Sequence, residues 1–230
     1  MRFFNSPRVP LREGQFIDSA AARFYHEHAR RFMMPIYRGL AAEAGKIKHN
    51  IKRVLDIGAG SGILEIELAK AHPDWRITGV DISEEMLKIA RDSAAGEGLT
   101  ERIDFLEGKA DALPFKDNSY DLVVSNASLH LWANPKKVLQ EIGRVTVRGG
   151  YCLIWDNLRI PAFYPLFRMV GWGMGMNKAQ RKMWLRAIES GYTAGEAKAL
   201  IKSSALRHAG VTINFKLLEL CIKWQKDQQT

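Results

Sequence analysis

The stretch from Val54 to Gly62 holds the residues best suited to chemistry, because an apolar run containing Asp56 passes into three alternate glycines. The run predicts a buried strand, and Gly58, Gly60 and Gly62 predict a tight turn whose backbone can approach a ligand closely. The segment that follows is apolar at helical spacing, so a helix N-terminus would point at the same ligand. The pattern indicates a binding turn, although a purely structural turn has the same glycines.

A second carboxylate, that of Asp81, ends the next predicted strand 19 residues after Gly62. In doubly wound sheets, an acid at this place hydrogen-bonds the ribose hydroxyls of an adenosine-containing ligand. The glycine spacing is G-x-G-x-G, which differs from the G-x-G-x-x-G of dinucleotide-binding turns. The two features together favour an adenosine-containing ligand.

At these residues, and over roughly Ile51 to Trp155, the chain resembles the class I S-adenosylmethionine-dependent methyltransferases. The resemblance is greatest to the ubiquinone-biosynthesis-like branch that acts on small molecules. The stretch Gly108–Phe115, with the sequence G-K-A-D-A-L-P-F, matches a third element of that family. The resemblance implies S-adenosyl-L-methionine as the cofactor.

The resemblance also implies which residues contact each part of this cofactor. A carboxylate near the amino-acid part is reasonable, because the ammonium and the sulfonium are both cationic. For the amino-acid part, the expected contacts are the backbone of Gly58, Ala59 and Gly60, the Asp56 carboxylate directly or through water, and Asn126, which could instead contact the substrate. For the adenosine, they are Asp81 at the ribose, Ile82 and Met86 against the adenine ring, Asp111 at the exocyclic amine and the Ala112 backbone at a ring nitrogen. Simple helix packing is the alternative for Met86.

Two side chains are candidates for a direct part in methyl transfer. His130 follows the fourth predicted strand, and an imidazole titrates near neutral pH, so it is the best general-base candidate. Packing beside the cofactor is the alternative role for His130. Tyr25 lies on a predicted helix before the first strand, and such helices often cap the cofactor in the resembled family. The neighbouring His26 and His28 are expected at the surface, and no metal site is recognisable.

The elements that must position these residues alternate between strand and helix. Strands are predicted at Arg53–Ile57, Trp75–Asp81, Ile103–Glu107, Tyr120–Ser125 and Tyr151–Trp155. Ser83 and Asn134 are expected helix caps, and Gly149-Gly150 is expected to end the helix before the fifth strand. The alternation predicts an α/β fold with a doubly wound, mostly parallel sheet, and the resemblance implies the Rossmann-like methyltransferase fold.

The chain divides into four predicted parts. Residues 1–50 form an N-terminal helical cap, with a helix from Asp18 to about Ala44 that is interrupted near Pro35, and residues 51–156 form the cofactor-binding core. Residues 157–210 are the candidate for a helical lid inserted after strand five, or for an extra helical layer of the core. Here Thr193 begins a capping box, and its helix is expected to end near Gly210. Residues 211–230 supply the last strand or strands, and the lack of a strong turn residue leaves a hairpin open.

The net charge of +9 is spread unevenly along the chain. Residues 1–50 carry +5, residues 51–156 carry −4 and residues 157–230 carry +8. Basic flanks suit an anionic substrate, an anionic membrane surface or RNA, and solvated surface helices explain them equally well. No apolar stretch approaches the length of a membrane span, no signal peptide is recognisable, and the two cysteines fit a reducing cytoplasm.

The function expected from the sequence is methyl transfer from S-adenosylmethionine to a small molecule. Aromatic and methionine side chains between 163 and 176 favour an apolar, aromatic, quinone-like or lipid-like acceptor. The alternatives are an RNA or protein methyltransferase and a non-catalytic cofactor-binding or partner-binding module. Nucleic acid is disfavoured as a partner, because Ser125–Ser128 replaces the N-P-P-Y-type loop of nucleic-acid amino methyltransferases. Peripheral membrane contact is compatible with the charge, and the oligomeric state stays open.

Overall fold

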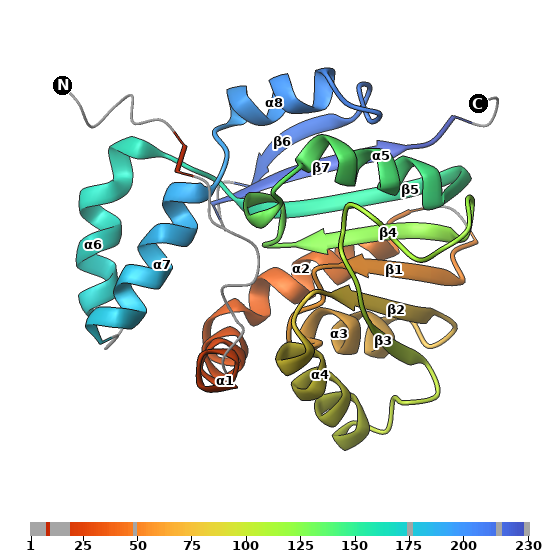
Figure 1. The fold of residues 1–230 in the computed structure, drawn as a ribbon, viewed down its shortest axis with the longest axis horizontal. Helices are drawn as coiled ribbons and strands as arrows, with labels where there is room; N and C mark the ends of the chain where they lie inside the picture. Colours follow the sequence, from red (N-terminus) through yellow and green to blue (C-terminus); the bar gives the residue numbers. More distant parts are fainter. Residues whose placement is uncertain (1–7, 10–18, 48–49, 174–176, 215–217, 228–230) are drawn as a thin grey trace.

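The computed structural model describes residues 8–9, 19–47, 50–173, 177–214 and 218–227. One seven-stranded sheet with strand order β3-β2-β1-β4-β5-β7-β6 forms its centre (Figure 1). The strands are β1 (Arg53–Ile57), β2 (Arg76–Asp81), β3 (Ile103–Glu107), β4 (Tyr120–Asn126), β5 (Thr146–Asn157), β6 (Gly210–Asn214) and β7 (Glu219–Gln225). The first five strands are parallel, β7 runs antiparallel to β5, and β6 runs antiparallel to β7. The predicted doubly wound fold is confirmed.

Helices cover both faces of the sheet, and each face has its own apolar core (Figure 1). The helices on one face are α2 (Met34–Gly45), α3 (Ile63–Ala71) and α4 (Glu84–Gly96), and those on the other are α5 (Pro135–Val145) and α8 (Ala194–Lys202). The helix α5 packs Val138, Leu139, Ile142 and Val145 inward, at the spacing of one helical face. Alternate faces of β1 likewise supply Val54 to one core and Leu55 to the other.

Three further helices lie at the end of the sheet where the parallel strands finish (Figure 1). They are α1 (Ser19–His28), α6 (Tyr164–Gly173) and α7 (Lys178–Ser190). A π-helical segment, Ala29–Met33, separates α1 from α2, and Pro35 stands in the first turn of α2. The predicted interruption near Pro35 is therefore confirmed, whereas Asp18, the predicted start of this helix, lies outside the described residues. Short 3₁₀ turns at Leu129–Leu131 and Pro161–Phe163 complete the helical elements.

Helix caps follow the sequence signals closely. The Ser83 side chain accepts a hydrogen bond from the Met86 N–H, and the Asn134 side chain accepts one from the Lys137 N–H. Thr193 and Glu196 form the complete capping box of α8. These side chains satisfy N–H groups that the first helical turn leaves without a partner.

Two predicted boundaries are wrong. Gly149 and Gly150 do not end the helix before β5, because α5 stops at Val145 and the glycines lie inside a longer strand. A side chain at Gly150 would come within 2.9 Å of the Asp121 carbonyl oxygen on β4, so the glycine permits close pairing of the two strands. The helix α8 ends at Lys202 and not near Gly210.

The question of a C-terminal hairpin is answered by the pairing of β6 with β7. Leu218, directly before β7, has a φ of +53°, which is a conformation that usually favours glycine or asparagine. Because a leucine occupies this position, the sequence carries no ordinary turn signal there. The pairing extends the sheet by two strands beyond β5.

Candidate functional site

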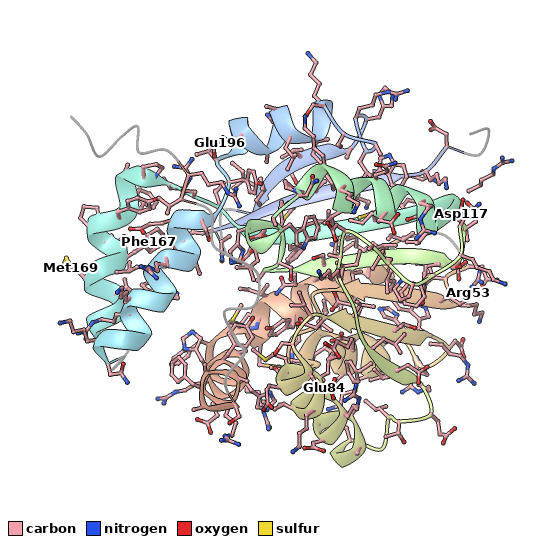
Figure 2. The ribbon with its side chains drawn as sticks, viewed as in Figure 1. Arg53, Glu84, Asp117, Phe167, Met169 and Glu196 are labelled. Atoms are coloured by element: carbon pink, nitrogen blue, oxygen red, sulfur yellow. The ribbon has the colours of Figure 1, made fainter. Side chains whose placement is uncertain are left out.

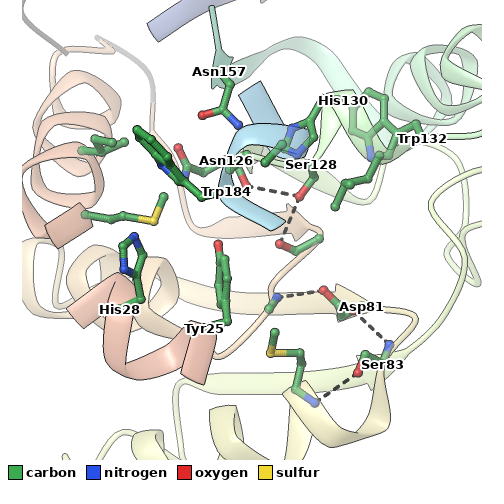
Figure 3. Close-up of a pocket in the computed structure, with 18 of the residues that line it drawn as sticks. Tyr25, His28, Asp81, Ser83, Asn126, Ser128, His130, Trp132, Asn157 and Trp184 are labelled. Carbon is green, nitrogen blue, oxygen red and sulfur yellow. Dashed lines mark hydrogen bonds between the residues drawn. The ribbon is translucent and has the colours of Figure 1, made fainter. Parts of the chain in front are cut away.

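A cavity of about 390 Å³ lies where β1, β2, β4 and β5 end (Figure 3). This is the edge at which open α/β sheets place their ligands. The loops after these four strands form its floor, and residues of α1, α6, α7 and β7 form its walls. Eight of the predicted site residues line it, namely Tyr25, Gly58, Gly60, Asp81, Ile82, Met86, Asn126 and His130. Asp56, Ala59, Asp111 and Ala112 do not line it.

The glycine turn after β1 is held against the loop after β4. Gly58 has a φ of +84°, and a Cβ there would lie 2.0 Å from the Ser128 hydroxyl oxygen. Gly60 also has a positive φ, of +54°, but the nearest atom to its Cβ position is a Tyr25 ring carbon 3.9 Å away. The first glycine thus permits tight packing within the protein. The second leaves open space on the cavity wall, where a ligand can approach the backbone.

Asp81 joins this turn to the end of β2. One carboxylate oxygen accepts a hydrogen bond from the Gly60 N–H at 2.8 Å, and the other accepts one from the Ser83 N–H at 2.9 Å. Burial raises the pKa of Asp81, whereas these backbone hydrogen bonds lower it. Each carboxylate oxygen has a further lone pair, so Asp81 can still accept hydrogen bonds from two hydroxyls. Met86 is buried and Ile82 is 38% exposed beside it on the same wall.

Asp56 lies beneath the turn and forms a buried acidic pair with Glu65 of α3. Both residues are almost wholly buried, with exposed fractions of 1% and 0%. Burial raises the pKa of both carboxyl groups, and the charge of Asp56 raises that of Glu65 further. Because Asp56 lies off the cavity wall, its role toward the amino group stays a prediction. Ala59 is likewise buried below the wall.

In the loop after β3, the residues that line the cavity precede those that the resemblance implies. Gly108, Lys109 and Ala110 line the cavity, whereas Asp111 and Ala112 lie beyond it. The Asp111 carboxylate is 3.6 Å from the Lys137 ammonium, and the Ala112 N–H donates to the Lys109 carbonyl. The predicted adenine contacts of Asp111 and Ala112 therefore stay predictions.

His130 and Asp156 form a buried dyad at the cavity. The His130 Nδ1 lies 2.7 Å from Asp156 Oδ1, and the His130 backbone N–H donates to Oδ2 at 2.9 Å. The Asn157 N–H donates to Oδ1 as well, at 2.6 Å. A carboxylate with these partners favours the tautomer in which Nδ1 carries the proton, so the other ring nitrogen, Nε2, is left as a proton acceptor. The arrangement suits a general base.

Asn126 and Tyr25 face the same cavity from opposite sides (Figure 3). The Asn126 side-chain oxygen is buried, and within the described part of the chain no donor reaches it. A buried carbonyl oxygen without a donor is costly, so a ligand N–H or ammonium would stabilise it. Burial raises the pKa of Tyr25, and a hydrogen bond with Tyr37 partly offsets this rise. Tyr25 therefore stays a neutral phenol at physiological pH.

The side chain of His28, which was expected at the surface, is half-buried and lines the cavity. It packs between Phe24 and Phe32, with ring centroids 5.9 Å and 4.9 Å away. Burial lowers the pKa of His28 and favours the neutral ring. His26, two residues earlier on the helix, does not line the cavity.

Aromatic side chains form the outer wall of the cavity. Trp184 of α7 and Phe167 of α6 meet edge to face with their ring centroids 6.0 Å apart, and both line the cavity. In Figure 3, Trp132 lies beyond His130, on the side away from Trp184, and it also lines the cavity. The helices α6 and α7 thus contribute walls, while their movement as a lid stays a prediction. Within the described ranges, no three His, Cys, Asp or Glu side chains are grouped as a metal site requires.

The residues that were not predicted from the sequence include Asn157 and Glu219 on the cavity wall, and Asp156, which is buried behind His130. Asp156 and Asn157 end β5, and polar residues at the carboxyl end of a parallel strand are candidates under the same rule that identified Asp81. Glu219, by contrast, begins an antiparallel strand, and no sequence pattern places it at the cavity. Its place depends on the long-range pairing of β7 with β5.

Comparison with known proteins identifies the central part of the chain. A family profile described as a methyltransferase domain matches residues 55–154. The demethylmenaquinone methyltransferase of Thermus thermophilus is 38% identical over 105 residues, which cover 46% of this chain and 47% of that protein. The ubiquinone/menaquinone biosynthesis C-methyltransferase UbiE of Hydrogenovibrio crunogenus is 35% identical over 108 residues, covering 46% of this chain and 42% of that enzyme. The matched region spans less than half of either relative.

Solved structures extend the likeness in fold to nearly the whole chain. The plantazolicin methyltransferase BpumL, solved in complex with SAH, superposes with a TM-score of 0.72 at 18% identity over 92% of each chain. A SAM-dependent methyltransferase of Aquifex aeolicus gives a TM-score of 0.66 at 18% identity, over 90% of this chain and 98% of that one. At these identities the structures support the fold alone. Residues 55–154 therefore match a methyltransferase domain, and the same region is similar to methyltransferases of menaquinone and ubiquinone biosynthesis.

Proposed function

We propose that this protein transfers the methyl group of S-adenosylmethionine to a small molecule with an apolar or aromatic body, such as a quinone-like compound. The observation that carries the proposal is that one cavity joins the glycine turn and Asp81 to the His130–Asp156 dyad and an aromatic wall. Relatives named as quinone-biosynthesis methyltransferases support the acceptor class.

The residues on the wall fit the cofactor. Open space beside the Gly60 backbone suits the amino-acid part, and the Asn126 oxygen without a donor suits its ammonium group. Asp81 can accept from the ribose hydroxyls, and the neighbouring Ile82 and Met86 form an apolar surface for the adenine. When bound, the cofactor supplies an electrophilic methyl group on a cationic sulfur.

The chain's own residues then align the acceptor and receive its proton. The aromatic wall holds the acceptor body and excludes water, so that the acceptor atom can attack the methyl group in line. The His130 Nε2 takes the proton from the acceptor, and the Asp156 carboxylate stabilises the imidazolium that forms.

Transfer of a labelled methyl group tests this function. The protein is incubated with S-adenosylmethionine tritiated in the methyl group and, separately, with a small-molecule extract, total RNA and denatured protein. Label in the small-molecule fraction alone is expected. Label in RNA or protein alone would support the alternative classes, and none in any fraction would favour a binding module.

A quinone- or lipid-like acceptor resides in a bilayer, and the outer face of α6 offers a surface for peripheral contact with one. Four apolar side chains are exposed there or just before it, namely Phe163, Leu166, Met169 and Val170, with Met169 71% exposed. In Figure 2, Met169 points away from the rest of the protein, whereas Phe167 points toward α7. Exposed basic residues of α7, namely Lys178, Lys182 and Arg186, suit anionic headgroups. Within the described residues, no helix is long and apolar enough to cross a membrane.

A further inference from the structure

The cavity wall carries a buried carboxyl group that the steps above do not use, that of Glu219. This residue begins β7 and pairs with Asn157 of β5 on one side and Asn214 of β6 on the other. Glu219 is only 5% exposed, yet it lines the cavity. Within the described part of the chain, its carboxyl group has no hydrogen-bond or ion-pair partner. A buried acid without a cation or donor is costly as an anion.

The acid whose charge acts on Glu219 is Asp156, whose carboxylate accepts three N–H groups. These donors stabilise a negative charge on Asp156, so the charge of this part of the cavity resides there. Two neighbouring buried carboxyl groups do not both ionise readily, and among the described residues no cation or hydrogen-bond donor stabilises an anion on Glu219. Glu219 therefore holds its proton near neutral pH.

The same surroundings also determine the pH at which the Glu219 carboxyl group titrates. Burial, with a contribution from the Asp156 charge, raises the pKa of Glu219 to about 8. Cys221, two residues along β7, has its own pKa raised by burial and by Glu219. The other titratable groups on the cavity wall are Tyr25, His28, Asp81, Lys109 and His130.

We propose that Glu219 binds the methyl acceptor as a neutral carboxylic acid and donates its O–H to a carbonyl or phenolic oxygen of that acceptor. This inference rests on the proposed function, because it assigns the polar contact within the same cavity. The neutral acid selects acceptors that carry an oxygen over cationic amines. It supplies a donor, while His130 Nε2 supplies an acceptor, so the site can recognise a molecule that offers both an oxygen lone pair and a hydroxyl.

The first measurement is the titration of Glu219 in the SAH complex. The protein is labelled with ¹³C at the glutamate side-chain carboxyl carbon, and the resonance lost in Glu219→Gln identifies the residue. A midpoint near pH 8 is expected. A midpoint in the ordinary glutamate range near pH 4 to 5 would overturn the proposal. Failure of SAH to bind wild type would instead count against the proposed function itself.

The second measurement compares two probes of one shape, 1-indanone and 1-aminoindane, by ligand-observed NMR on the SAH complex. At about pH 6.5 the ketone should bind more tightly than the ammonium ion. Its affinity should fall roughly tenfold by about pH 9, because the protonated fraction of a group with a pKa of about 8 falls by that factor. Tighter binding of 1-aminoindane, or no binding of 1-indanone up to its solubility limit, would contradict the proposal.

Two variants separate hydrogen bonding from packing. Glu219→Gln keeps a neutral donor, so it should retain ketone binding and lose the pH dependence. Glu219→Leu keeps the volume without a donor, so ketone binding should be weak at both pH values. SAH affinity should stay unchanged in both, which shows that the fold is intact. Equal ketone affinity in all three proteins at low pH would overturn the proposal.

Discussion

Replacing Asp156 with asparagine tests the dyad, because an asparagine cannot reproduce its hydrogen bonds. The carboxylate accepts three N–H groups, with one oxygen shared by His130 Nδ1 and the Asn157 N–H and the other taken by the His130 N–H. An amide has one oxygen, so in either orientation its NH₂ group faces a backbone N–H. The variant should therefore lose about 1–3 kcal/mol of unfolding free energy.

The catalytic consequence depends on the orientation of the new amide. If the NH₂ group occupies the Oδ1 position, it donates to His130 Nδ1 and moves the ring proton to Nε2. Nε2 can then no longer accept a proton, and kcat should fall by about 10²–10⁴-fold with SAH affinity unchanged. This orientation keeps the His130 backbone hydrogen bond, which fixes the loop that carries the ring.

The direct assay is the ¹⁵N chemical shift of the His130 ring, assigned by comparison with His130→Gln. Wild type should show a protonated Nδ1 and an unprotonated Nε2, and Asp156→Asn should show the reverse. Asp121→Asn is a matched control, because Asp121 accepts two backbone N–H groups at the opposite end of the sheet. A folded Asp156→Asn variant with a wild-type ring tautomer and wild-type turnover would show that Asp156 does not set the protonation of the His130 ring.

Three further predictions concern the cofactor site and the outer surface. Asp81→Ala should weaken SAH binding by about 1–3 kcal/mol, which is roughly 5–150-fold in the affinity measured by calorimetry. Asp74 is exposed, so Asp74→Ala should leave the affinity unchanged. Equal SAH affinity in Asp81→Ala and wild type would remove Asp81 from the site. Gly60 has a φ of +54° and its backbone faces the cavity, so Gly60→Val should abolish SAH binding. The helical circular dichroism of the variant should be unchanged. Tight SAH binding by the variant would be inconsistent with a turn that contacts the ligand. Vesicles containing phosphatidylglycerol should sediment the wild type better than pure phosphatidylcholine vesicles do, and Met169→Glu should reduce that binding; sedimentation independent of lipid charge would argue against membrane contact.

The sequence predicted the sheet and its binding edge because these depend on local patterns. Apolar runs and the caps at Ser83 and Asn134 placed the first five strands in order, and the glycine turn with Asp81 located the floor of the cavity. The less predictable parts arise from long-range pairing. The placement of Glu219 depends on a hairpin whose turn lacks a glycine, and that of Trp184 depends on how α7 packs at the end of the sheet. For Asp56, the sequence predicted the position in the motif but not the burial of the side chain beneath the turn.

Calorimetric titration of SAH into the wild-type protein shows directly whether the cavity binds the cofactor product. We expect saturable binding of one SAH per chain, with affinity reduced in Asp81→Ala. Absence of binding by the folded wild-type protein at millimolar SAH would contradict the proposed cofactor site.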